Sequence, residues 1–223
     1  MVRAFLAVLL LTAPVLAAPR SYRVAPPSAG SKAEAVVVYS LGTHTQTATD
    51  IQGELTADPA TLATVEGKVV VPIASLRGDG STRDCHMREA LGLDYAAGGR
   101  FPAEHVCDND NRLPASGPEA IAFSDIRLEL ISARPLDELS LLDAGKPVRV
   151  EVEAKWTIHG VTRPARELVR VLRDGEGLRA RGRSTIVLKD FGVVVKSTKV
   201  LFATITVGDA VTVTYDLKLV PTS

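Results

Sequence analysis

The chain has 223 residues, with 26 basic and 26 acidic side chains, no formal net charge and 46% hydrophobic residues. It lacks the basic excess with which proteins bind nucleic acid or an anionic membrane surface, so we expect neither as the main partner. The length suits a single all-β barrel or sandwich with a sizeable core.

The N-terminus predicts a secretory signal peptide. Arg3 precedes the apolar run Ala4–Thr12, and a small-residue cleavage pattern ends at Ala17. The run is shorter than the roughly 20 residues of a membrane helix, and no later segment is apolar enough to span, so no integral membrane segment is expected. We therefore expect cleavage near Ala17, removing residues 1–17, and a periplasmic or secreted mature protein.

The mature chain is expected to begin with a flexible stretch. Residues 18–32 are rich in Pro, Ser and Gly, with room for a short strand at Ser21–Val24. Residues 33–223 are expected to form the folded domain. Its first strands are expected at Glu34–Leu41, Asp50–Thr56 and Val65–Leu76.

A helix is predicted at Ser81–Leu91, with Ser81 as its cap, and the stretch Gly92–Pro118 after it is loop-like. The helix carries Cys85 and the loop carries Cys107, and in an exported protein such a pair predicts a disulfide. The alternative is a metal site formed by Cys85, His86, His105 and Cys107, although this spacing matches no common zinc pattern.

The second half of the chain is predicted to be strands. In Ala120–Ser132 the apolar phase slips between Phe123 and Ile126, which predicts a bulge near Asp125. The clearest strand follows Pro147, where one face holds only apolar residues: Val148, Val150, Val152, Ala154, Trp156 and Ile158.

The last strands are expected at Thr162–Arg173, Leu178–Leu188 and Val211–Leu219, with a hairpin at Asp174-Gly175. Alternation places Arg179, Arg181 and Arg183 together on an outer face. This stripe is either a solvated face paired with acids such as Glu151 and Glu153, or a docking face for a phosphate head group or an acidic partner.

About eight antiparallel strands with one apolar face predict a barrel or a sandwich. The inner face is slim at Ala154, Ala180, Gly182 and Ser184, and aromatic residues make up only 4% of the chain. Slim walls are compatible with an open lumen for a ligand, and also with a closely packed sandwich of Val and Leu.

The stretch WTIHGVTRP, from Trp156 to Pro164, is predicted to be a hairpin corner. The strand phase turns Trp156 inward and His159 outward at the strand end, and Gly160 permits the turn. The stretch supplies no nucleophile or carboxylate partner for His159, so we interpret His159 as structural. The chain also lacks the common hydrolase, metalloprotease and nucleotide-binding motifs, so we expect neither an enzyme nor a cofactor.

Together with KDFGV (Lys189–Val193), this corner resembles the YceI-like family of exported lipid-binding proteins. TRDCHMREA (Thr82–Ala90) and AIAFSD (Ala120–Asp125) resemble two further motifs of the family, in the same order. The resemblance implies an eight-stranded antiparallel barrel, similar to lipocalins, with a short helix near one mouth and a lumen that holds a long-chain isoprenoid. The loop Gly92–Pro118 departs from the family's shorter link.

The resemblance and the strand phases together predict a soluble carrier for an isoprenoid of the polyprenyl phosphate or quinone type. Two alternatives stay open: an enzyme that acts on a lipid or uses a metal at the Cys and His residues, and a filled barrel that works as an interaction module. Oligomeric state is not predicted. The side chains expected to line the lumen are Phe123, Val150, Val152, Trp156, Ala180, Gly182, Ile186, Phe191, Val213, Tyr215 and Leu217.

Overall fold

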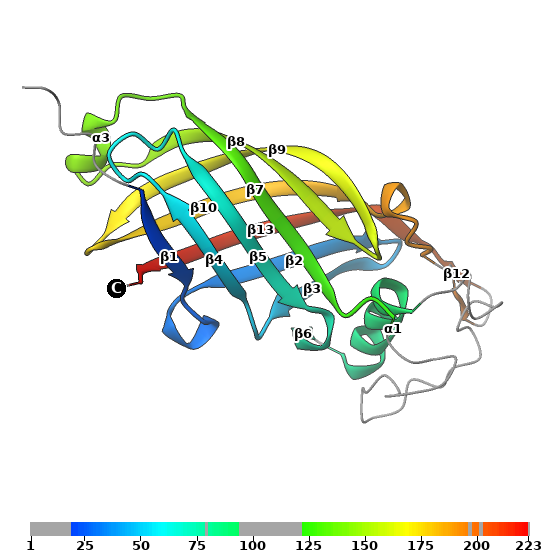
Figure 1. Cartoon of the computed structure of the whole chain (residues 1–223). Helices are drawn as coiled ribbons and strands as arrows, with labels where there is room; N and C mark the ends of the chain where they lie inside the picture. The colour runs from blue at the N-terminus through cyan, green and yellow to red at the C-terminus, as the bar shows by residue number, and fades with distance from the viewer. Residues whose placement is uncertain (1–18, 79, 94–121, 196–197, 201–202, 223) are drawn as a thin grey trace, which may run out of the picture.

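The structure is a computed structural model that describes residues 19–78, 80–93, 122–195, 198–200 and 203–222. Within these residues, eight antiparallel strands form a closed ring, which confirms the predicted barrel (Figure 1). In ring order they are β1 (Arg20–Val24), β4 (Gln52–Ala57), β5 (Val65–Pro72), β7 (Asp125–Pro135), β8 (Val148–Ile158), β9 (Val161–Asp174), β10 (Gly177–Val187) and β13 (Val207–Pro221).

Strand β1 closes the barrel and confirms the short strand expected at Ser21–Val24, within the stretch that was expected to be flexible. It pairs with β4 on one side and with the end of β13 on the other, where Val24 lies opposite Leu219. Tyr22 and Val24 are buried, at 1% and 5% exposure. The short apolar alternation in this segment therefore outweighs the surrounding Pro and Ser residues, because its two inward side chains join the core.

Three further strands extend the sheet from the other half of β13: β2 (Lys32–Tyr39), β3 (Gly42–Ala48) and β6 (Leu76–Arg77). Sequence reasoning missed β3. Its buried positions include His44 and Gln46, so the strand lacks the apolar alternation that revealed the others.

The remaining elements are short. Helix α1 (Ser81–Gly92) confirms the predicted helix, although Gly80 and not Ser81 occupies its N-cap position. It lies at the end of the barrel where the β2–β3 hairpin turns (Figure 1). The others are η1 (Pro27–Ala29), η2 (Ile73–Ser75), α3 (Ser140–Asp143), η3 (Leu188–Phe191) and the hairpin β11 (Thr198–Val200) with β12 (Ala203–Ile205). None of the helices in the described ranges has both the length and the apolar character needed to cross a bilayer.

The bulge expected near Asp125 lies elsewhere. Strand β7 begins at Asp125, and its register against β8 shifts between Leu130 and Ser132, where Ile131 is 40% exposed. The phase slip in the sequence arose because Phe123 precedes the strand and does not share its alternation.

The end of the barrel near α3 is filled with side chains. Tyr22 from β1, Leu142 from α3 and Val148 from β8 are at most 2% exposed there. Side chains buried to this degree leave little space for a ligand between them.

Candidate ligand cavity

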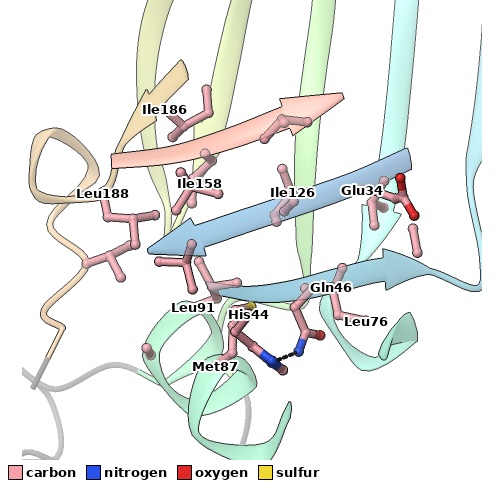
Figure 2. Close-up of a pocket in the computed structure, with 18 of the residues that line it drawn as sticks. Glu34, His44, Gln46, Leu76, Met87, Leu91, Ile126, Ile158, Ile186 and Leu188 are labelled. Atoms are coloured by element: carbon pink, nitrogen blue, oxygen red, sulfur yellow. Dashed lines mark hydrogen bonds between the residues drawn. The ribbon is translucent and has the colours of Figure 1, made fainter. Parts of the chain in front are cut away.

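A cavity of about 940 Å³ occupies the α1 end of the barrel. Inward side chains from β2, β3, β5, β7, β8, β10 and β13 form its wall, and α1 and the segment after η3 contribute at the end. Figure 2 shows Ile126, Ile158 and Ile186 converging on it from three different strands. Because successive strand residues point to opposite faces, each strand contributes alternate residues.

The wall is predominantly aliphatic. Representative lining residues are Val69 on β5, Leu128 on β7 and Val213 on β13. Small side chains also line the cavity, at Ala33 and Ala35 on β2 and Ala48 on β3. A wall of this kind offers apolar contact area to a ligand and few directional contacts, so it suits a hydrocarbon chain.

Helix α1 covers the end of the cavity with Met87, Ala90 and Leu91 (Figure 2 labels the first and last). These positions fall at the spacing that places side chains on one face of a helix. On α1, Asp84 and Arg88 are 3% and 2% exposed, and Arg88 is not among the lining residues. Burial lowers the pKa of Arg88, as does the charge of Arg77, while Asp84 opposes the shift.

The hairpin between β8 and β9 anchors the C-terminus of α1. His159 Nε2 lies 2.7 Å from the Leu93 carbonyl oxygen. The rings of His159 and Phe123 meet edge to face, with centroids 4.4 Å apart. Gly160 is required beside them, because its φ is +74° and an added Cβ would lie 2.6 Å from the Phe123 ring.

These contacts correct the expected orientation of His159. The residue is half-buried and joins the helix to the barrel, whereas strand phase placed it on the outer surface. The phase fails at this point because His159 has a φ of +51° and no longer belongs to the strand.

A second group of polar residues lies between β3 and α1, at the same end of the cavity. Gln46 is fully buried, and its amide nitrogen lies 2.5 Å from both His44 Nε2 and Asp84 Oδ1 (Figure 2 shows the contact with His44). The Gly78 amide donates to the other Asp84 oxygen at 2.9 Å. The polar side chains that line the cavity are Glu34, His44, Gln46, Arg83, His86 and Glu89.

The inner end of the cavity is formed by two aromatic rings whose polar atoms are turned away from it. Trp156 and Tyr215 line the cavity, while Trp156 Nε1 donates to Glu167 at 2.8 Å and Tyr215 Oη donates at 3.4 Å. Ser184 also donates to Glu167. Burial, and then the charge of Glu167, raise the pKa of Tyr215. Sequence reasoning missed Glu167. The one clue in the sequence is that Glu167 is the only acidic residue among the positions of β9 that point inward.

Five of the eleven residues predicted to line the lumen do line this cavity: Trp156, Ile186, Val213, Tyr215 and Leu217. Their contact with a ligand stays a prediction. Val150 and Val152 point inward as expected, but they are buried in the filled half of the barrel, at 2% and 6% exposure.

The other four predicted residues also lie away from the cavity. Ala180 and Gly182 lie on β10 nearer its start than the cavity residue Ile186. Gly182 leaves room for the Tyr215 side chain, which a Cβ at position 182 would overlap. Phe191 is buried in η3 and lines a smaller cleft of about 710 Å³ between β9 and β10. Phe123 packs on His159. Strand phase predicts which residues point into the barrel but not where along the barrel axis they lie. The cavity occupies only the part of the interior near α1.

Two arginines of the predicted stripe, Arg179 and Arg181, share one acidic partner. Arg179 Nε and Arg181 Nε lie 2.5 Å and 3.0 Å from the two carboxylate oxygens of Asp216 on β13. Burial alone would raise the pKa of Asp216, but the bonds and charges of the two arginines lower it. The partner is therefore Asp216 and not Glu151 or Glu153.

The pairing of Cys85 with Cys107 stays a prediction. Cys85 is 1% exposed on α1, and Cys107 lies outside the described residues, as does His105 of the alternative metal site. His86 Nδ1 lies 3.0 Å from Glu89 Oε2. Across the described ranges, His, Cys, Asp and Glu side chains form no group of three or more that could hold a metal ion. The predicted signal peptide also lies outside the described residues.

Solved structures share this fold at low sequence identity. A polyisoprenoid binding domain from Saccharophagus degradans matches with a TM-score of 0.59 and 14% identity, covering 91% of this chain and 99% of that one. BcnA from Burkholderia cenocepacia matches with a TM-score of 0.61 and 15% identity, covering 87% and 99%. A YCEI protein from Campylobacter jejuni matches with a TM-score of 0.52 and 13% identity, covering 80% and 84%.

No curated protein matches the chain significantly. The sequence model of the YceI-like domain matches residues 22–219, which begin within the strand that closes the barrel, β1, and end within its last strand, β13. The match therefore includes every strand of the ring and the helix at the cavity end. The chain belongs to the YceI-like domain family.

Proposed function

We propose that this protein is an exported carrier that holds a long-chain isoprenoid lipid in the barrel cavity, for transport, storage or sequestration. The observation that carries the proposal is the aliphatic cavity of about 940 Å³ at the α1 end. The Saccharophagus degradans relative is a polyisoprenoid binding domain, which supports the same ligand class here.

The cavity accounts for binding without catalytic groups. Transfer of apolar surface from water contributes about 25 cal/mol per Å², so a branched hydrocarbon chain that fills the cavity binds through area alone. The inner end of the cavity is suited to a hydrocarbon chain. The polar atoms of Trp156 and Tyr215 hydrogen-bond to Glu167, and the two rings line the cavity. An isoprenoid chain needs few polar partners, and the aliphatic wall supplies few.

A pair of tryptophan substitutions on β2 tests the proposal. Ala35 lines the cavity, whereas Val38 is 58% exposed on the outer face of the same strand. Ala35→Trp places a large ring in the path of the chain and should strongly weaken binding of a polyprenol, measured by displacement of a fluorescent fatty alcohol. Val38→Trp should leave that binding unchanged. Equal polyprenol binding by both variants, with the fold retained, would refute the cavity as the binding site.

Export is inferred from the sequence between Arg3 and Ala17. Protein recovered from the source cells should lack the first 17 residues and begin at Ala18. Intact-mass measurement decides this, since a mature chain that retains Met1 contradicts both the cleavage and the proposed site of action.

A further inference from the structure

One buried acceptor at the polar end of the cavity has no partner. Gln46 is 0% exposed and lines the cavity, and its Oε1 makes no hydrogen bond within the part of the chain that the structure describes. Buried polar atoms are nearly always hydrogen-bonded, so an orphan acceptor beside a cavity indicates a partner that the cavity can supply. Oε1 itself is closed to water in this structure, so a group in the cavity reaches it through a small movement of the Gln46 side chain.

The orientation of the amide follows from its neighbour. Asp84 Oδ1 lies 2.5 Å from the amide nitrogen of Gln46, and an ionised carboxylate only accepts hydrogen bonds. The amide nitrogen therefore has to face Asp84, because the reverse orientation would set two acceptors against each other. The Gly78 amide on the second Asp84 oxygen holds the carboxylate in place. Gln46 Oε1 is thereby fixed as the acceptor without a partner.

The carboxylate next to Gln46 disfavours an anionic ligand at this point. Glu34, Glu89 and Arg83 also line the cavity, with Lys32 2.9 Å from Glu34. Asp84 lies directly behind Gln46. A phosphate placed against Gln46 would meet like charge and an acceptor, neither of which stabilises it. A neutral group that donates a hydrogen bond suits both features.

We propose that Gln46 Oε1 accepts a hydrogen bond from the hydroxyl group of a neutral isoprenoid, an alcohol or a hydroquinone, whose chain fills the aliphatic part of the cavity. The assignment rests on the proposed function and narrows it, because it favours hydroxyl-bearing lipids over polyprenyl phosphates and oxidised quinones.

A matched ligand pair tests the assignment. Farnesol and farnesyl methyl ether share one chain, but only farnesol donates a hydrogen bond. The wild-type protein should bind farnesol about tenfold more tightly than the ether, as measured by displacement of a fluorescent probe. If neither compound binds, this inference fails, and the proposed function fails with it only if a long-chain polyprenol does not bind either. If both bind equally, only this inference fails, and a buried water satisfies Gln46.

Two glutamine substitutions locate the effect. Gln46→Met keeps a long side chain but removes the acceptor, so the preference for farnesol should fall to about one while the ether binds as before. Gln52→Met is the control, since Gln52 is exposed on β4, bonds Asp50 and does not line the cavity. A preference that survives Gln46→Met would overturn the assignment. If Gln46→Met does not fold, the wild-type ratio still decides.

Discussion

Trp156 Nε1 donates a hydrogen bond of 2.8 Å to Glu167 Oε1 across the β8–β9 ladder. The one tryptophan of the chain is thereby fixed with its ring against the cavity and its polar edge against a buried carboxylate. Ser184 and Tyr215 donate to the same carboxylate, so a single acid sets the inner end of the ligand cavity.

Replacing Glu167 should therefore be costly for stability. Glu167→Ala leaves the donors of Trp156, Ser184 and Tyr215 without their acceptor, and we expect the free energy of unfolding to fall by about 2–4 kcal/mol. Glu153→Ala on the exposed face of β8 is the control and should change it by less than about 0.5 kcal/mol. Chemical denaturation followed by tryptophan fluorescence measures both. Similar values for the two variants would contradict this role of Glu167.

The contact between His159 and Leu93 should control the helix over the cavity. His159→Gln can still donate to the Leu93 carbonyl, so ligand affinity should stay within a few-fold of wild type. His159→Ala removes the anchor, and amide exchange in α1 and ligand release should both become faster. Hydrogen-exchange mass spectrometry and stopped-flow release measure these effects. Unchanged exchange in α1 for His159→Ala would show that other contacts hold the helix.

Gly182 should tolerate no side chain. A Cβ at this position overlaps the hydroxyl group of Tyr215, so Gly182→Ala should lower the free energy of unfolding by about 1–3 kcal/mol. Adding Tyr215→Phe removes that hydroxyl and should recover part of the loss. Thermal unfolding of the single and double variants checks the coupling. Strictly additive losses would mean that the two side chains do not interfere.

Stability should depend on Asp137 at low pH. Hydrogen bonds from the Arg149 side chain and backbone lower the pKa of Asp137 to about 2, from an ordinary value of 3.8. Because the folded-state pKa is the lower one, this carboxylate stabilises the fold above about pH 4, and its contribution is lost as pH falls toward 2.

Asp137→Asn should therefore destabilise the protein at neutral pH, and the difference from wild type should shrink as pH falls through this window. Melting temperatures of both proteins across that range measure the trend. A difference that stays constant with pH would contradict the linkage.

Much of the barrel could be predicted because its strands alternate apolar and polar residues. The alternation failed at β3, where His44 and Gln46 occupy buried positions. It also failed to separate Val152, in the filled half, from Trp156, on the cavity wall, because both share one phase. The position of the cavity along the barrel depends on which residues of other elements fill the interior, as Tyr22 and Leu142 do. A pattern within one strand does not contain that information.

The polar parts of the site were the least predictable. Glu167 and Gln46 are isolated polar residues whose partners lie on other elements, so only the fold brings them together with Tyr215 and Asp84. The corner motif around Trp156 was more informative, because its family resemblance implied the barrel and its lumen before any contact was visible.

Native mass spectrometry of the protein purified from its source cells tests the central claim most directly. The account predicts a population heavier than the polypeptide by the mass of one lipid, which organic extraction and fragmentation should identify as an isoprenoid. The Ala35→Trp variant, purified in the same way, should carry much less. A wild-type protein that is free of lipid, and that binds no added polyprenol, would contradict the proposal that the cavity holds an isoprenoid chain.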